Sequence, residues 1–274
     1  GGFRGEAFGW SGWSNFATFF GAENLDDKDW FTTLPGTAYL WAYGCGAGSF
    51  TRANGVGSTG DFATKGSKAV FTMLFGSYFG DWNERDSFLR APLAAEGLGL
   101  TCAWAGRPQW IFHPMALGRN IGYCARRTQA NNAIGDYPSP DNTRLTKSGK
   151  NDDSEWDLNP IHVALMGDPT LRLHPVPPPV KATASKTDKG LALRWEPGAV
   201  PPKTDEETYL VYRAPSLDGP FRRLTKEPLK ETRFIDPEAE VGGAVYLIKT
   251  RILQETASGT YFNTSQGLFL ELAK

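Results

Sequence analysis

The sequence has no strong excess of charge of either sign. Its 29 Lys and Arg residues oppose 30 Asp and Glu residues, which gives a formal net charge of -1 at pH 7. Binding to a phosphate backbone or to an anionic membrane surface depends on clustered positive charge. The composition therefore predicts no nucleic-acid partner.

Long apolar runs and cofactor motifs are also missing. No run reaches the roughly 18 apolar residues of a membrane-spanning helix, and the first residues lack the basic-then-apolar pattern of a secretory signal. Zinc-type Cys/His spacing, a P-loop and a dinucleotide-binding Gly fingerprint are absent. We expect no membrane span, no metal and no other cofactor. Because the chain begins Gly-Gly-Phe rather than with Met, we expect it to be a piece of a longer protein.

Cysteine and histidine are scarce. The three cysteines, Cys45, Cys102 and Cys124, are an odd number, so at least one is free or bonded elsewhere. The three histidines all follow Cys45 in the sequence: they are His113, His162 and His174. A catalytic pair in which the histidine precedes Cys45 in the sequence therefore cannot be formed by these three histidines.

Proline is concentrated at one place. Residues 174–180 have the sequence HPVPPPV, and clustered Pro favours an extended spacer that interrupts regular structure. A chain of 274 residues is long enough for two cores. We therefore predict one domain over residues 1–174, a hinge over residues 175–179 and a second domain over residues 180–274.

The second domain has the pattern of an antiparallel β-sandwich. Alternating apolar and polar residues, bounded by turn residues, predict strands near residues 191–195, 209–213, 244–249, 260–262 and 267–272. The segment resembles a fibronectin type III domain, with Trp195 ending the second strand, Tyr209 beginning the third and Tyr246 in the sixth. We expect an all-β immunoglobulin-like sandwich with Trp195 and Tyr246 in its core.

The first domain has the pattern of an α/β layered fold. Apolar runs at residues 37–43, 69–75, 98–104 and 161–166 are typical of strands buried on both faces, as in a parallel or mixed sheet. Residues 86–96 and 115–129 predict helices beside that sheet. The fold class expected for the whole chain is therefore α/β followed by all-β.

The most informative segment is YGCGAGSF at residues 43–50. It places Cys45 in a Gly-rich turn at the end of a buried strand, where ligands and catalytic groups often gather. The backbone amides of Gly46, Ala47 and Gly48 could stabilise an oxyanion beside an attacking thiolate. The alternative is a buried structural cysteine on a tight turn.

A second segment adds to this interpretation. Residues 165–173 have the sequence LMGDPTLRL and directly precede the sandwich. Together with the Cys turn, this ending resembles the gingipain-like cysteine peptidases, whose caspase-like α/β domain closes in such a run and is often followed by an immunoglobulin-like domain. The resemblance implies a caspase-like layered sheet with flanking helices, Cys45 as nucleophile and a peptide or protein substrate. The alternative for the GDPT sequence alone is a turn leaving the last strand.

The resemblance also implies a histidine before the cysteine, and this chain lacks it. Either that His lies upstream of Gly1, or the lineage has lost it. His113 is the candidate replacement base, if the fold brings its loop over Cys45. Without a base, a thiol with an ordinary pKa of about 8.5 is only slightly ionised at neutral pH.

Two loops carry candidate substrate contacts. Tyr78 and Asp81 lie in a loop rich in Gly and aromatic residues after the second strand, and Arg107 follows the third. Asp81 could select a basic substrate side chain, and Arg107 could hold a carboxylate. The structural alternative is that Asp81 caps a turn while the aromatic residues cover the sheet edge.

The function expected from these patterns is a fragment of a gingipain-like cysteine endopeptidase, exported by a bacterium and secreted or held at the cell surface. The alternative is a catalytically silent surface protein on the same scaffold, which uses the sandwich for adhesion to a cell-surface ligand. A carbohydrate-binding module is a third possibility that rests only on the nine Trp residues.

Overall fold

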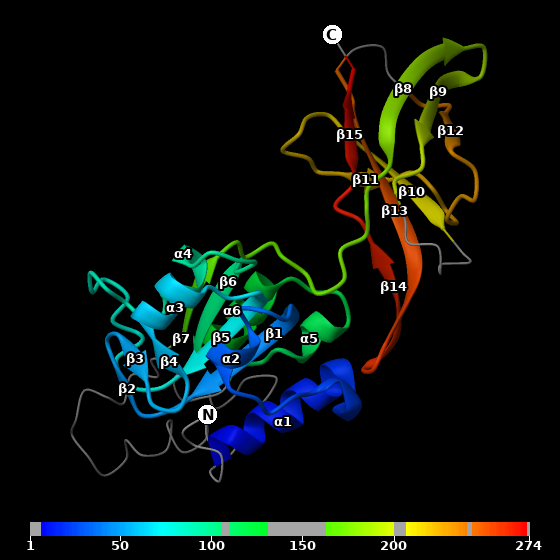
Figure 1. The fold of residues 1–274 in the computed structure, drawn as a ribbon. Helices are drawn as coiled ribbons and strands as arrows, with labels where there is room; N and C mark the ends of the chain where they lie inside the picture. The colour runs from blue at the N-terminus through cyan, green and yellow to red at the C-terminus, as the bar shows by residue number, and fades with distance from the viewer. Residues whose placement is uncertain (1–6, 106–109, 131–162, 200–206, 240–242, 273–274) are drawn as a thin grey trace, which may run out of the picture. The chain divides into compact units, whose positions relative to one another are not determined.

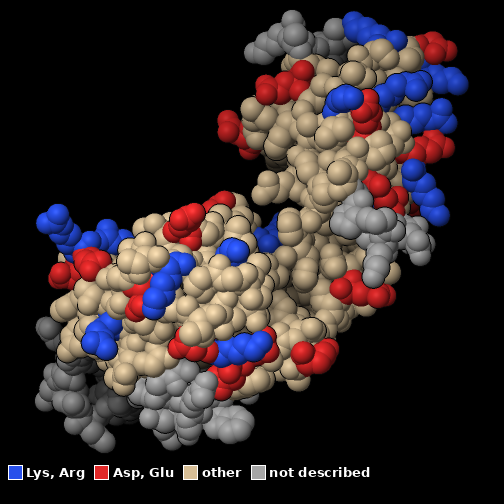
Figure 2. All heavy atoms as spheres, in the orientation of Figure 1, with Lys and Arg blue, Asp and Glu red and all other residues tan. Residues whose placement is uncertain are grey.

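A computed structural model describes residues 7–105, 110–130, 163–199, 207–239 and 243–272. The chain divides into two compact units, Gly1–Leu173 and His174–Lys274, which are coloured blue to green and green to red in Figure 1. The division falls beside the Pro-rich segment. Each unit has its own apolar core, and positive and negative side chains are mixed on the face of each unit shown in Figure 2.

The first unit is built on a four-stranded sheet with strand order β1-β5-β6-β7. The strands are β1 (Tyr39–Cys45), β5 (Ala69–Phe75), β6 (Thr101–Ala105) and β7 (Val163–Gly167). The first three run parallel, and β7 pairs antiparallel with β6. The four apolar runs in the sequence thus predicted the four strands of this sheet.

Helices cover both faces of the sheet. On one face the core contains residues of α1 (Ala7–Phe20), α5 (His113–Ala116) and α6 (Ile121–Ala130). On the other it contains residues of α2 (Trp30–Thr33), α3 (Thr59–Lys65) and the start of α4 (Ala91–Ala94). Neighbouring strand residues alternate between the two cores, as Trp41 and Ala42 do. Among the described residues, no helix is long and apolar enough to cross a membrane.

A short meander separates β1 from α3. It contains β2 (Gly48–Ser49), β3 (Arg52–Ala53) and β4 (Gly57–Ser58), which pair antiparallel in sequence order. Ser58 then caps α3, because its side chain accepts from the Asp61 N–H while the Asp61 carboxylate accepts from the Ser58 N–H. A single-turn 3-10 helix, η1 (Ala22–Asn24), follows α1.

The helix predicted over residues 86–96 is wrong for most of its length, because only α4 forms there. Phe88 and Leu89 are wholly buried from the irregular segment that precedes α4. The Arg90 guanidinium instead holds the preceding loop by donating to the carbonyls of Glu84 and Arg85.

The helix predicted over residues 115–129 is two helices. Gly118 has φ 89°, a left-handed conformation that ends α5. Asn120 then caps α6, because its side-chain oxygen accepts from the Tyr123 N–H at 2.8 Å. Continuous apolar periodicity across the break concealed it in the sequence.

The second unit is an antiparallel sandwich of two sheets. One has the order β12-β9-β8 and the other β11-β10-β13-β14, with β15 also pairing with β13. The strands are β8 (Val180–Thr187), β9 (Gly190–Glu196), β10 (Thr208–Ala214), β11 (Arg222–Arg223), β12 (Arg233–Asp236), β13 (Val245–Thr256), β14 (Gly259–Thr264) and β15 (Leu268–Glu271). Placing the first, second and fifth strands in one sheet and the others in the second is the arrangement of an immunoglobulin-like or fibronectin type III-like domain.

The predicted core of this sandwich is confirmed. Trp195 is 4% exposed and Tyr246 is fully buried. The Tyr246 hydroxyl donates to Asp236 Oδ2 at 2.7 Å, and Arg213 Nη1 donates to the same oxygen at 2.6 Å. Burial and the nearby Asp236 carboxylate both raise the pKa of Tyr246, so the phenol remains a donor across the ordinary pH range.

This hydrogen bond gives a stability prediction. Tyr246→Phe keeps the ring and removes one donor from a buried carboxylate, so the free energy of unfolding of the second unit should fall by about 1.5 to 3 kcal/mol. Chemical denaturation followed by fluorescence measures the loss. The control is Tyr212→Phe on the same strand pair, since the Tyr212 hydroxyl has no hydrogen bond within the described ranges. Equal effects of the two substitutions would contradict the role assigned to Tyr246.

Candidate functional site

Cys45 is the last residue of β1, at the carboxyl end of the parallel part of the sheet. Its register partner is Phe75, the last residue of β5. The cysteine is a free thiol and is 4% exposed. The structure therefore places Cys45 where the sequence predicted it, at the end of a buried strand before a tight turn.

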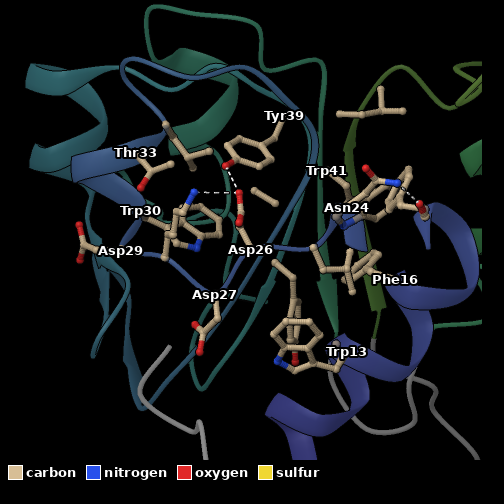
Figure 3. Close-up of a pocket in the computed structure, with 18 of the residues that line it drawn as sticks. Trp13, Phe16, Asn24, Asp26, Asp27, Asp29, Trp30, Thr33, Tyr39 and Trp41 are labelled. Carbon is tan, nitrogen blue, oxygen red and sulfur yellow. Dashed lines mark hydrogen bonds and ion pairs between the residues drawn. The ribbon is translucent and has the colours of Figure 1, made fainter. Parts of the chain in front are cut away.

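Cys45 also lines a cavity of about 350 Å³. Side chains from three segments surround this space (Figure 3), and they come from α1, from residues 24–34 and from β1. The side chains of α1 that line it are Trp13, Phe16 and Phe20. A space of this size is at the lower end of those that hold small ligands or short peptide segments.

Tyr43 is a polar neighbour of Cys45 on β1. Residues two apart on a strand share a face, and the side chains of Tyr43 and Cys45 form a hydrogen bond. Burial and the Cys45 sulfur raise the pKa of Tyr43, so its phenol is neutral at neutral pH. A neutral phenol that donates to a thiolate favours the charged form of the sulfur. Sequence reasoning missed Tyr43, although the spacing of two residues was a usable signal.

The glycines of the turn have a packing role. A Cβ atom on Gly46 would collide with the Asn54 carbonyl oxygen, and one on Gly48 would meet the Ser77 carbonyl oxygen and the Phe79 ring. The space that the missing side chains leave is thus filled by the protein's own atoms. The turn needs glycine for its own folding, whatever approaches from outside.

The predicted oxyanion donors differ in availability. The Gly46 N–H donates to the Phe75 carbonyl at 3.1 Å, which ties it to the sheet. The Ala47 carbonyl accepts from the Asn54 N–H at 2.9 Å, which fixes the start of the meander. The candidates that remain for an oxyanion are the amides of Ala47 and Gly48.

His113, the candidate replacement base, begins α5. The preceding residue, Phe112, packs against Trp41 with ring centroids 4.9 Å apart. Trp41 stands four strand residues before Cys45, a span of about 13 Å, so the start of α5 lies alongside the middle of β1. Burial, and next the positive charge of Arg127, lower the pKa of His113. A base role for His113 stays a prediction.

Of the two other histidines, only His174 lies within the described residues, and it is not among the residues that line the cavity. His162 falls outside the described residues. His174 belongs to the second unit, where its carbonyl accepts from Asn263 Nδ2 at 2.7 Å. Burial lowers the pKa of His174.

Two of the three predicted substrate contacts, Tyr78 and Asp81, lie in the loop after β5. The Asp81 N–H donates to the Tyr78 carbonyl at 3.2 Å, and the Asp81 carbonyl accepts from Glu84. Tyr78 has φ 68° and packs against Phe50, with ring centroids 5.1 Å apart. Neither Tyr78 nor Asp81 is among the residues that line the cavity. Arg107 lies outside the described residues.

Sequence reasoning missed the acidic wall of the cavity. Asp26 Oδ2 accepts from the Tyr39 hydroxyl at 2.5 Å and from Lys28 Nζ at 3.0 Å, as Figure 3 shows. The hydrogen bond from Tyr39, followed by that from Lys28, lowers the pKa of Asp26. Asp29 caps α2 by accepting from the Thr32 N–H at 2.9 Å. No pattern in residues 26–29 indicated that Asp26 contacts Tyr39 of β1, because only the tertiary fold brings them together.

The structure also bears on metal binding. Within the described ranges, no three His, Cys, Asp or Glu side chains are grouped closely enough to hold a metal ion.

The three thiols differ in surroundings, which gives a prediction about reactivity. Cys102 is fully buried in β6, and burial raises its pKa. Burial raises the pKa of Cys124 to about 12, and its Sγ donates to the Phe112 carbonyl at 3.8 Å. Cys45 lines the cavity, so a small thiol alkylator should modify Cys45 first, as mapped by mass spectrometry at neutral pH. Faster labelling of Cys102 or Cys124 in the folded protein would contradict this order.

Comparisons with known proteins complete the description. No family model matches the chain, and no curated protein matches it. Among solved structures, the twitchin kinase region from C. elegans is 19% identical, with a TM-score of 0.24, 36% of this chain covered and 17% of that chain covered. Titin module A71 from human cardiac muscle is 18% identical, with a TM-score of 0.25 and coverage of 34% and 86%. Titin kinase with its flanking domains is 19% identical, with a TM-score of 0.23 and coverage of 37% and 18%. The chain thus spans less than a fifth of the two kinase-containing structures.

Proposed function

We propose that the first unit is the caspase-like α/β domain of a gingipain-like cysteine endopeptidase, with Cys45 as its nucleophile. The observation that carries the proposal is the position of Cys45, a free thiol that ends a parallel strand and lines a cavity. The protein would be a bacterial one, secreted or held at the cell surface, with the sandwich as an accessory module.

The chemistry starts with the Cys45 thiolate, which attacks the carbonyl carbon of a peptide bond. The Tyr43 phenol supports the thiolate by its hydrogen bond. The oxyanion that forms would be held by the backbone amides of Ala47 and Gly48. Release of the amine then requires a proton, and a general acid at the leaving group is the usual source.

The acid–base partner decides how far the reaction proceeds in this chain. His113 starts a helix alongside the middle of β1, and its lowered pKa favours the neutral imidazole. The neutral form can accept a proton, but the position favours Cys45 acting without it. We therefore propose a nucleophile that can be acylated when the leaving group needs no protonation.

An activated ester tests the nucleophile separately from the base. The chain should release about one equivalent of nitrophenolate in a burst from p-nitrophenyl acetate, because this leaving group departs without a general acid. Cys45→Ser should abolish the burst, and the matched control Cys102→Ser should keep it. Absence of a burst from the unmodified chain would favour the catalytically silent surface protein.

Peptide hydrolysis should behave differently. A mixed peptide library should not be turned over by the 274-residue chain as it stands, since losing the base removes both thiolate formation and protonation of the amine. Mass spectrometry of the library before and after incubation measures this. Turnover that disappears in Cys45→Ser and in His113→Ala would show that His113 acts as the base and that the inactive-chain prediction is wrong.

A further inference from the structure

The loop that follows β5, residues 76–80, lies directly against the Cys turn. A Cβ atom on Gly76 would collide with the Gly46 carbonyl oxygen, and one on Gly48 would collide with the Ser77 carbonyl oxygen. The backbones of the two segments are thus in contact at two places, with no side chain between them. In a close-packed interior, a shift of one such segment has to move the other. The conformation of the Cys turn therefore depends on that of the loop.

Phe79 fills the contact between the loop and the Cys turn. Its side chain is wholly buried, and its ring lies where a Cβ atom on Gly48 or Gly76 would be. The ring also packs against Phe88, with ring centroids 5.1 Å apart. Tyr78, the preceding residue, has φ 68°, a conformation that a residue other than Gly keeps only where its surroundings hold it. Phe79 can support the turn only while the loop is held in this conformation.

Trp104 of β6 holds both ends of the loop. Its indole Nε1 donates to the Gly76 carbonyl at 3.0 Å. Its six-membered ring lies against Gly80, where a Cβ atom would come within 3.0 to 3.2 Å of three ring carbons. Among the described residues, the bond from Trp104 is the only hydrogen bond that joins residues 76–80 to a residue before 76 or after 81. The loop thus depends on one side chain for its polar attachment.

We propose that Trp104 is a positioning residue for Cys45. The indole N–H fixes Gly76, and the loop then holds residues 46–48 through the contacts described above. Those residues carry the amides beside the sulfur. Trp104 is not among the residues that line the cavity, so it acts only through the loop. The link to catalysis rests on the proposed function, whereas the link to the geometry of the turn does not.

The alkylation rate of Cys45 measures this positioning without any catalytic reaction. Cys45 is 4% exposed, so iodoacetamide reaches its sulfur when the surrounding structure opens locally. Trp104→Phe keeps an aromatic ring and removes the indole donor. We expect Cys45 of the 274-residue chain to be alkylated about fivefold faster in this variant, since the loss of one hydrogen bond shifts a local opening equilibrium by a factor of that order. An unchanged rate would overturn the proposal.

Two controls separate positioning from a general loss of structure. Cys102 lies on the same strand as Trp104, two residues away, and is wholly buried, so its labelling rate should not change. Equal acceleration of Cys45 and Cys102 would mean that the substitution only loosens the sheet, and the proposal would fail. The matched variant is Trp110→Phe. The Trp110 indole Nε1 donates to the Trp104 carbonyl at 2.8 Å, so the same kind of donor is lost without a direct contact to residues 76–80. Labelling of Cys45 should be unchanged in it.

A second replacement covers the case in which Trp104→Phe does not fold. Replacing the Trp104 indole by benzothiophene, as 3-benzothienylalanine, keeps the two-ring shape against Gly80 and removes only the N–H. Faster alkylation of Cys45 in this variant would support the proposal, and the rate of the unmodified chain would overturn it.

The nitrophenolate burst distinguishes this inference from the proposed function. Trp104→Phe should lower the rate constant of the burst and leave its amplitude unchanged, because Cys45 is still present but its oxyanion donors are no longer held in place. No burst from the unmodified chain, together with faster alkylation in Trp104→Phe, would remove the proposed function and leave the positioning role. A burst with the same rate constant in both chains, together with unchanged alkylation, would do the reverse.

Discussion

The parallel pairing of β1 with β5 is the constraint on which the first unit depends. It sets Cys45 beside Phe75 at the carboxyl end of the sheet, and it fixes which backbone groups of β1 are used. With Trp41 and Tyr43 facing one helical layer and Ala42 the other, the strand is held on both faces and along one edge. Residues of the same strand, from Tyr39 to Tyr43, line the cavity. The location of the cysteine and the shape of the cavity are therefore two results of one pairing.

The turn after Cys45 is packed so closely that it has room for glycine but not for a larger residue at positions 46 and 48. The backbone of Gly46 and Gly48 lies against Asn54, Ser77 and Phe79, so the turn has essentially one way to fold. Such a turn holds Cys45 and the amides of Ala47 and Gly48 in fixed relation before any substrate arrives. Preorganised donors of this kind stabilise developing charge without reorganising during the reaction. The glycines beside Cys45 thus contribute rigidity to the turn.

The sequence predicted the parts of the fold that depend on local patterns. Runs of apolar residues identified all four strands of the first sheet, and alternation identified the main strands of the sandwich and its core at Trp195 and Tyr246. Prediction failed where tertiary contacts override periodicity, as at Phe88 and Leu89, which are buried from an irregular loop. The position of Cys45 at the end of a buried strand was predictable because the apolar run and the glycines lie next to it in the sequence. Trp13 and Asp26 were not, because they meet β1 only through the packing of α1 and residues 24–34.

Proton transfer is the step that limits the proposed chemistry of Cys45. Cleavage of a peptide bond by a cysteine nucleophile depends on where the thiol proton goes and on where the proton for the leaving amine comes from. Tyr43 can stabilise a thiolate by donating a hydrogen bond, but its raised pKa keeps the phenol protonated, so it cannot accept the thiol proton. A phenol that keeps its proton and a thiol that must lose one cannot form an acid–base pair by themselves. If the proposed function holds, turnover would therefore be governed by a third group, and the position of that group relative to Cys45 would decide between an enzyme and a catalytically silent protein.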